Sequence, residues 1–202
     1  MMPWPIFGLV SFAVVLPFAA YGVSVLRVQA EKRRELPRWR SLATSQAGTL
    51  VERGRSVELR LRQGSVIATR HERPRHWGGV RWARWETVVS VPTPEHWPAS
   101  IELYGRRAIS EIVTTRRRVP IEPTFDRVVL VRDPDGDAAE PARARLSDPA
   151  LREGIANVLS AAPRMWVAQG QIRCRIPGLA SPRMVESSLL AARKLGQHLT
   201  RA

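Results

Sequence analysis

The longest apolar stretch of the chain lies near its N-terminus. From Pro5 to Leu26 the sequence carries no charged side chain. As a helix rising about 1.5 Å per residue, this stretch reaches about 33 Å, which matches the hydrocarbon core of a bilayer. Trp4 lies where an interfacial aromatic anchor belongs. The pattern predicts a transmembrane helix, with a cleaved signal peptide and a buried core helix as the alternatives.

Basic residues follow the apolar stretch at once, and no Lys or Arg precedes it. The positive-inside rule then predicts that the rest of the chain lies in the cytoplasm, below a single span in the inner membrane. Pro37 is expected to end the helix. This divides the chain into an anchor with a juxtamembrane basic helix (1–36) and a domain (37–202). The basic residues of the flank are Arg27, Lys32, Arg33, Arg34, Arg38 and Arg40.

Beyond Pro37, alternating patterns predict strands. Apolar and charged residues alternate from Val57 to Leu61, a turn follows at residues 63–65, and Val66 to Thr69 returns, which is typical of a hairpin with one buried face. A second hairpin is expected across Gln169-Gly170. Further strands are expected at residues 80–91, 100–104, 109–113 and 127–132.

Helical periodicity predicts two helices in the C-terminal third. One opens at Asp148-Pro149 and runs to Ser160, and the other runs from Pro182 to Thr200, each with an apolar face. A shorter helical pattern spans residues 39–47 and stops at Gly48. The predicted fold class is α+β: an N-terminal transmembrane helix, then a β-rich, mostly antiparallel domain that ends in the order β-α-β-β-α.

One part of the chain resembles a known group of proteins. Residues 121–127 read IEPTFDR, a strand follows to Val131, and Ala142-Arg143, Leu146 and Pro149 precede a helix and a hairpin. Over residues 119–177 this resembles an uncharacterised bacterial membrane-anchored domain family. The resemblance implies a membrane location in a bacterium and no particular activity.

The net charge of +14 favours contact with polyanions, either lipid headgroups or nucleic acid. The flank residues Arg27, Lys32, Arg33 and Arg34 would lie against headgroups. Residues 75–85 interleave aromatic and basic side chains, so Trp82 and Trp85 fill the core or contact a membrane, a partner or single-stranded bases. A regular strand would point them to opposite faces. A third basic group is Arg116-Arg117-Arg118.

Other reactive residue types lack the spacing of a site. The lone cysteine, Cys174, sits in an alternating run typical of a strand, and His71, His76 and His96 fit no metal motif. The acidic turn from Asp133 to Asp137 lacks the glycine and glutamate positions of a calcium loop. We predict no catalytic residue, cofactor or metal.

These patterns favour a non-enzymatic, membrane-anchored interaction or scaffold domain. Its expected partners are the lipid bilayer, anionic headgroups and a protein of unknown identity. Two alternatives remain open, a membrane-tethered nucleic-acid-binding protein, which the residues favour less, and an enzyme whose site assembles from dispersed residues.

Overall fold

The computed structural model describes residues 4–62, 64–74, 81–93, 101–105, 117–134, 136–168 and 170–201. The side chains of residues 4–17, 73, 74, 81, 82, 168, 200 and 201 lie outside this description. The expected strand at 109–113 and the histidines at 76 and 96 also lie outside it.

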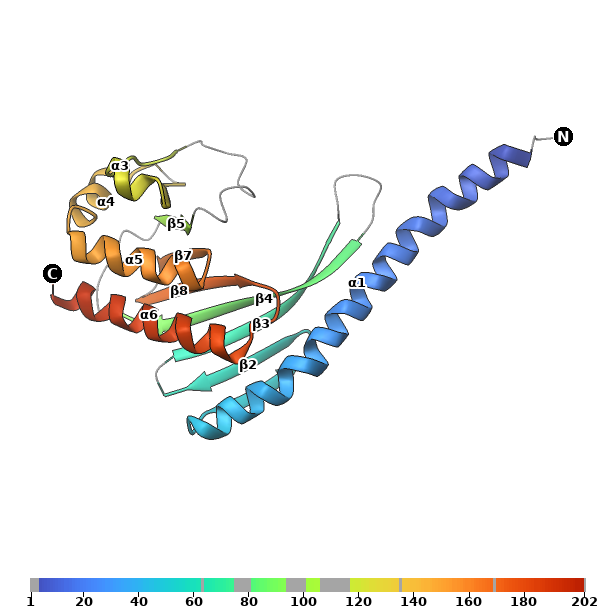
Figure 1. Ribbon diagram of the computed structural model, residues 1–202, viewed down its shortest axis with the longest axis horizontal. Helices are drawn as coiled ribbons and strands as arrows, with labels where there is room; N and C mark the ends of the chain where they lie inside the picture. The colour runs from blue at the N-terminus through green and yellow to red at the C-terminus, as the bar shows by residue number, and fades with distance from the viewer. Residues whose placement is uncertain are drawn as a thin grey trace.

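The described residues form one antiparallel sheet of eight strands, in the order β1-β2-β3-β4-β8-β7-β5-β6 (Figure 1). Neighbouring strands from β1 to β4 are joined in sequence order, whereas the hairpin of β7 and β8 lies between β4 and β5, which are distant from it in the chain. The strands are β1 (Thr49–Arg53), β2 (Ser56–Leu61), β3 (Gly64–Pro74), β4 (Arg81–Pro92), β5 (Glu102–Gly105), β6 (Val129–Arg132), β7 (Arg164–Ala168) and β8 (Gln171–Pro177).

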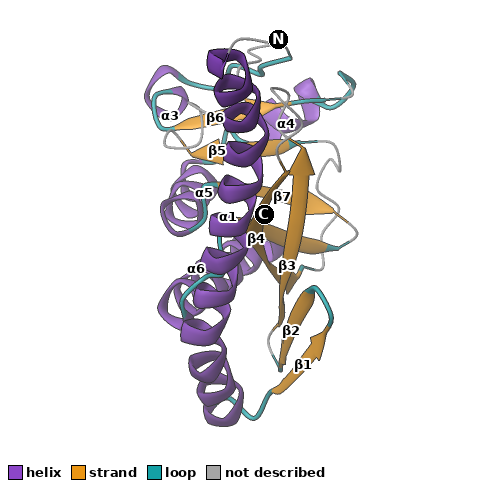
Figure 2. Cartoon of the chain, turned by 90° about the vertical axis from the view of Figure 1, so that its right-hand side faces the viewer, coloured by secondary structure: helices purple, strands orange, loops and turns teal. Residues whose placement is uncertain are grey.

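Within the described residues, three long helices lie on one side of this sheet (Figure 2). They are α1 (Trp4–Ser45), α5 (Pro149–Ala161) and α6 (Pro182–Arg201), and two short helices, α3 (Pro123–Asp126) and α4 (Ala139–Arg145), flank β6 in sequence. The N-terminal part of α1 extends away from the sheet (Figure 1). The sheet therefore has one face covered by helices, called here the helix face, and an opposite face, called here the open face.

The core lies between the sheet and the helices. Along β8, Ile172, Cys174 and Ile176 are fully buried, while the residues between them are half-buried, which is the alternation of a strand with one covered face. Helix α6 sends its apolar stripe, with Val185 and Leu199 near its two ends, into the same layer. The two helices predicted in the C-terminal third, the two hairpins and a strand within residues 127–132 are thus confirmed as parts of one α+β fold.

The C-terminal half of α1 belongs to the domain. Trp39 is fully buried, and its indole N–H donates to the carbonyl oxygen of Ala180 at 2.8 Å. The helix runs through Pro37 to Ser45, so the prediction that Pro37 ends it is wrong, and the short helix expected at 39–47 is its last part. Ala47 then adopts a φ of 50°, and the Gly48 N–H donates to the carbonyl of Ala43, which ends the helix where the sequence predicts.

Three elements were not expected from the sequence. Strand β1 extends the first hairpin, α3 forms one turn around Phe125, and α4 follows the turn after β6. Among the residues that the structure describes, no helix is both long enough and apolar enough to cross a bilayer.

Candidate functional site

The predicted basic flank lies on α1 and divides into two groups. Arg27 and Arg33 are exposed, and Arg27 forms an i,i+4 pair with Glu31 at 3.4 Å. Lys32 instead reaches the domain, where its ammonium lies 3.0 Å from the carboxylate of Glu52 on β1. The hydrogen bond from Lys32, together with that from Arg40, holds the pKa of Glu52 below its usual value although partial burial opposes this. Part of the flank therefore fastens α1 to the sheet.

Arg34 belongs to a different ion-pair group. It contacts Glu35, which is 2% exposed, at 2.7 Å, and Arg38 approaches the same carboxylate at 3.4 Å. A buried carboxylate is costly without partners, so these two arginines offset the cost of placing Glu35 against the domain. Both keep more than half of their side-chain surface exposed.

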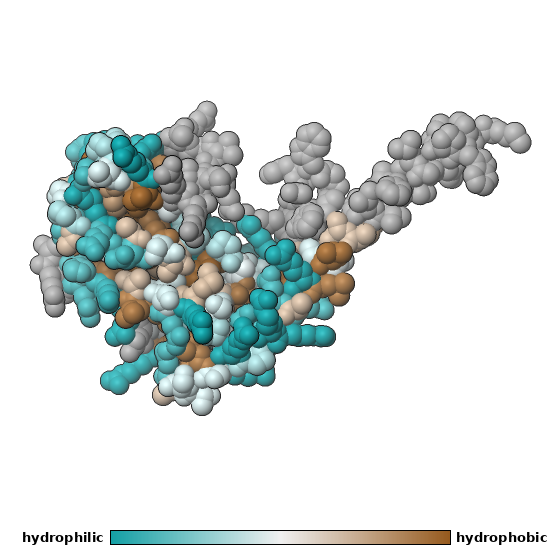
Figure 3. Space-filling model, in the orientation of Figure 1, coloured by the Kyte–Doolittle hydropathy of each residue, from teal (hydrophilic) through white to brown (hydrophobic). Residues whose placement is uncertain are grey.

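Apolar side chains are exposed on α1 just before the basic flank. Phe18, Val23 and Leu26 are 74%, 63% and 66% exposed. Figure 3 shows apolar surface where α1 leaves the sheet. These three residues continue the uncharged stretch from Pro5, so the apolar surface ends where the basic residues begin. A contiguous exposed apolar surface on a helix is typical of a contact with lipid or protein.

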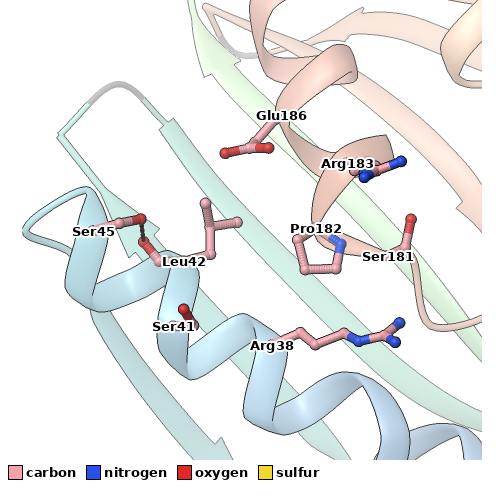
Figure 4. A pocket seen from close by; sticks show the side chains of 8 residues that line it. All are labelled: Arg38, Ser41, Leu42, Ser45, Ser181, Pro182, Arg183 and Glu186. Carbon is pink, nitrogen blue, oxygen red and sulfur yellow. Dashed lines mark hydrogen bonds between the residues drawn. The ribbon is translucent and has the colours of Figure 1, made fainter.

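An open groove of about 730 Å³ separates the C-terminal part of α1 from the start of α6 (Figure 4). Arg38 extends from α1, and Arg183 lies across from it on α6. Leu42 faces the groove between the two helices, and Glu186 accepts a hydrogen bond from Gln46 at 3.3 Å. The remaining lining consists of three serines, Ser41, Ser45 and Ser181, together with Pro182. This groove is too open and too poor in reactive groups to indicate catalysis.

A third group of charged side chains lies on the open face at β5 and β7. Glu102 accepts from Arg164 at 2.5 Å and also from the hydroxyl of Tyr104. Burial and the neighbouring Glu102 raise the pKa of Tyr104 above its usual value. The guanidinium of Arg164 lies over the rings of Tyr104 and Trp166, at 5.1 Å and 5.4 Å from their centroids. The sequence patterns did not single out these residues, although Arg173 and Arg175 occupy alternate positions of β8 and Arg164 lies on β7 of the same hairpin.

The remaining predicted contact residues are dispersed. Trp85 is 3% exposed, and its indole N–H donates to the carbonyl of Val28 at 3.0 Å, so it belongs to the interface between α1 and β4. A ring buried in this way cannot stack on a base. Arg118 lies 3.7 Å from Asp126, and Arg117 is exposed with a φ of 67°. The side chain of Trp82 and all of Arg116 lie outside the described residues.

The surroundings of Cys174 and Asp133 indicate structural roles for both residues. Cys174 is fully buried, and burial raises the pKa of its thiol to about 12, so the thiolate is scarce at neutral pH. The carboxylate oxygens of Asp133 accept the backbone N–H groups of Gly136 and Ala138, at 2.9 Å and 2.8 Å. This is the geometry of a side chain that closes a turn. Within the described residues, no group of three or more His, Cys, Asp or Glu side chains is placed to hold a metal.

The fold and these surfaces define a class: an α+β domain with helices on one sheet face and a long N-terminal helix that carries basic and apolar surfaces. A solved structure of the mycobacterial trehalose monomycolate transport factor A, TtfA, resembles the chain with a TM-score of 0.51 and 15% identity. The match covers 81% of this chain and 93% of that chain, and at this identity it shows a shared fold alone. No family model matches the chain. No curated protein matches it either.

Proposed function

We propose that the protein is a single-pass, non-enzymatic interaction domain fixed to the cytoplasmic face of a bacterial inner membrane. Residues 5–26 would form the anchor, and the long helix α1 would join it rigidly to the sheet. The observation that carries this proposal is the change along one continuous helix, from the exposed apolar side chains of Phe18, Val23 and Leu26 to the buried side chains of Val28, Trp39 and Leu42.

The contacts of α1 support a fixed rather than a flexible attachment. The backbone carbonyl of Val28 accepts from Trp85, and the hydroxyl of Ser24 accepts from the backbone N–H of Ala83 at 3.2 Å. A flexible linker would have no such contacts with the domain it holds. The domain would therefore keep one orientation relative to the membrane, which suits a protein that presents a surface to a partner.

The exposed basic residues support contact with anionic headgroups. Arg27 and Arg33 follow the apolar surface within two turns of helix, and each basic residue near such a membrane contributes about 1 kcal/mol to binding. The fold likeness to a protein named as a transport factor is compatible with a role beside a membrane transport process. That likeness does not identify a substrate for this chain.

Alkaline extraction of membranes tests the anchor. The full chain should stay in the membrane pellet, since a helix from Pro5 to Leu26 is held by its apolar surface and not by charge. Val14→Arg places a charge near the middle of the stretch at a cost of about 2.5–3.5 kcal/mol and should shift the protein toward the supernatant. Leu190→Arg, on an exposed position of α6, is the matched control and should remain in the pellet. Release of the unaltered chain by alkali would contradict the proposal.

A further inference from the structure

The open face carries a compact group of arginines that is distinct from the basic flank of α1. The register of the antiparallel strands places two rows of side chains across this face. One row joins Arg132, Glu102, Trp166 and Arg173, and the other joins Tyr104, Arg164 and Arg175. Directly opposed residues have Cβ atoms about 4.5–5.5 Å apart, so each row is a set of neighbours on one face.

Positive charge exceeds negative charge in this group. Arg132 and Arg164 share a single carboxylate, Glu102, at 3.8 Å and 2.5 Å, and Arg175 pairs with Glu86 on β4. Arg164 and Arg175 are also directly opposed across β7 and β8, a placement that is unfavourable for two like charges. Among the described residues, Arg132, Arg164 and Arg175 thus share two glutamates, and a further carboxylate would lower the repulsion.

Two guanidinium groups also retain unused donors. The Nε atoms of Arg132 and Arg164 are shielded from solvent, and neither has a hydrogen-bond partner in the part of the chain that the structure describes. An unpaired buried donor carries a desolvation cost. Because one carboxylate serves both arginines, a second carboxylate would let each guanidinium take its own partner.

The aromatic side chains favour a carboxylate ligand over a nucleic acid. Base stacking requires an accessible ring face, but the guanidinium of Arg164 lies over both Tyr104 and Trp166, and Tyr104 is 5% exposed. A bilayer is also an unsuitable occupant, because the N-terminal end of α1 lies far from β5 and β7 (Figure 1).

We propose that the open face at β5, β7 and β8 binds an acidic peptide segment of a partner protein. This inference rests on the proposed function, since it identifies the surface and the class of partner for the interaction domain. Glu102 is the internal competitor of the ligand: its carboxylate occupies the guanidinium groups that the segment binds. Its removal would strengthen binding, whereas removal of the arginines would weaken it.

Fluorescence anisotropy with labelled oligoglutamate tests the proposal on the full chain in neutral detergent. Oligoglutamate should bind with an affinity that falls as salt rises, and oligoglutamine should not bind. The double variant Arg164→Gln with Arg173→Gln should weaken binding at least about tenfold, because two charge-assisted contacts are lost. Arg33→Gln, on α1, is the matched control and should leave the affinity unchanged.

Glu102→Gln keeps all four arginines and should tighten oligoglutamate binding severalfold. Damage to the fold cannot produce this gain, so the variant keeps the test decisive even if the arginine variants unfold. Absence of saturable binding at low salt would overturn the proposal, as would weaker binding by Glu102→Gln. Equal affinity for oligothymidylate with the same dependence on Arg164 and Arg173 would also overturn it, in favour of nucleic acid. Since the assay contains no bilayer, its failure leaves the membrane anchor standing, and failure of the anchor leaves this result unchanged.

Discussion

Two parts of α1 have the same backbone conformation, but their described apolar side chains lie in different environments. In the C-terminal half, Trp39, Leu42 and Ala43 are buried against the sheet and α6. Before Arg27, the described side chains include Phe18, which is 74% exposed. Packing removes the first group from water, while the second group leaves apolar surface exposed, which is typical of a contact with lipid or protein. One continuous helix therefore carries both part of the domain core and an exposed apolar surface.

Truncation of Trp39 should cause the largest loss of stability among the variants that compare the two parts of α1. Trp39→Ala removes a fully buried ring and its hydrogen bond to Ala180, so the free energy of unfolding should fall by about 3–5 kcal/mol. Phe18→Ala, in the exposed half, should change it by less than about 0.5 kcal/mol. Urea unfolding in detergent measures both, and equal losses would show that the two halves do not differ.

The exposed part of the basic flank should have an intermediate effect on membrane contact. A fragment of residues 23–202 keeps every described core residue, from Val28 to Leu199. In this fragment, Arg27→Gln with Arg33→Gln should reduce binding to anionic vesicles by about 2 kcal/mol. Arg62→Gln with Arg127→Gln removes the same charge elsewhere and should have little effect. Co-sedimentation measures the partition, and equal losses from both pairs would mean that net charge alone governs binding.

The hydrogen bond between β4 and α1 should contribute less to the free energy of unfolding. Trp85→Phe keeps most of the buried ring but removes the N–H that donates to Val28, so the free energy of unfolding should fall by about 1 kcal/mol. Hydrogen exchange should also increase at residues 24–32 and not at residues 185–195 on α6. Exchange that rises equally in both helices would indicate general loosening of the core instead.

The ion pair between α1 and β1 should give the smallest effect, and one that depends on pH. Glu52 has a lowered pKa because Lys32 and Arg40 donate to its carboxylate. Its contribution to stability is therefore present above the ordinary carboxyl pKa and is lost as pH falls through the lowered value. Glu52→Gln should remove this part of the acid dependence of the melting temperature and leave stability at neutral pH within about 1 kcal/mol. An unaltered acid dependence would contradict the assignment.

Local patterns predicted most of the elements, because hairpins and amphipathic helices depend on neighbouring residues. The alternation at Val57–Leu61 and the capping Asp148, which accepts from Ala150, appear as predicted. The course of α1 was not predictable in this way. Pro37 lacks the N–H of a regular helix, but the burial of Trp39 and Leu42 stabilises the helix beyond it.

The arginines of the open face show a second kind of arrangement that the sequence pattern predicts only in part. Arg164 and Arg175 lie in one predicted hairpin, so their proximity follows from the sequence. Glu102 and Arg132 join them only because β5 pairs with both β6 and β7, a long-range arrangement that periodicity does not encode. The exposed basic flank was visible in the sequence, but its division between solvent and the ion pair with Glu52 depends on how α1 packs.

Labelling of introduced cysteines by a membrane-impermeant maleimide tests the central claim most directly. Cys174 is buried with a raised pKa and gives little background. In inverted membrane vesicles, Arg183→Cys and Arg33→Cys should be labelled, whereas Val15→Cys, near the middle of the uncharged stretch, should be protected until detergent is added. In right-side-out vesicles none of the three should react. Labelling of Val15→Cys as fast as Arg183→Cys, or of Arg183→Cys from the outer face, would contradict a cytoplasmic domain held by a membrane-spanning α1.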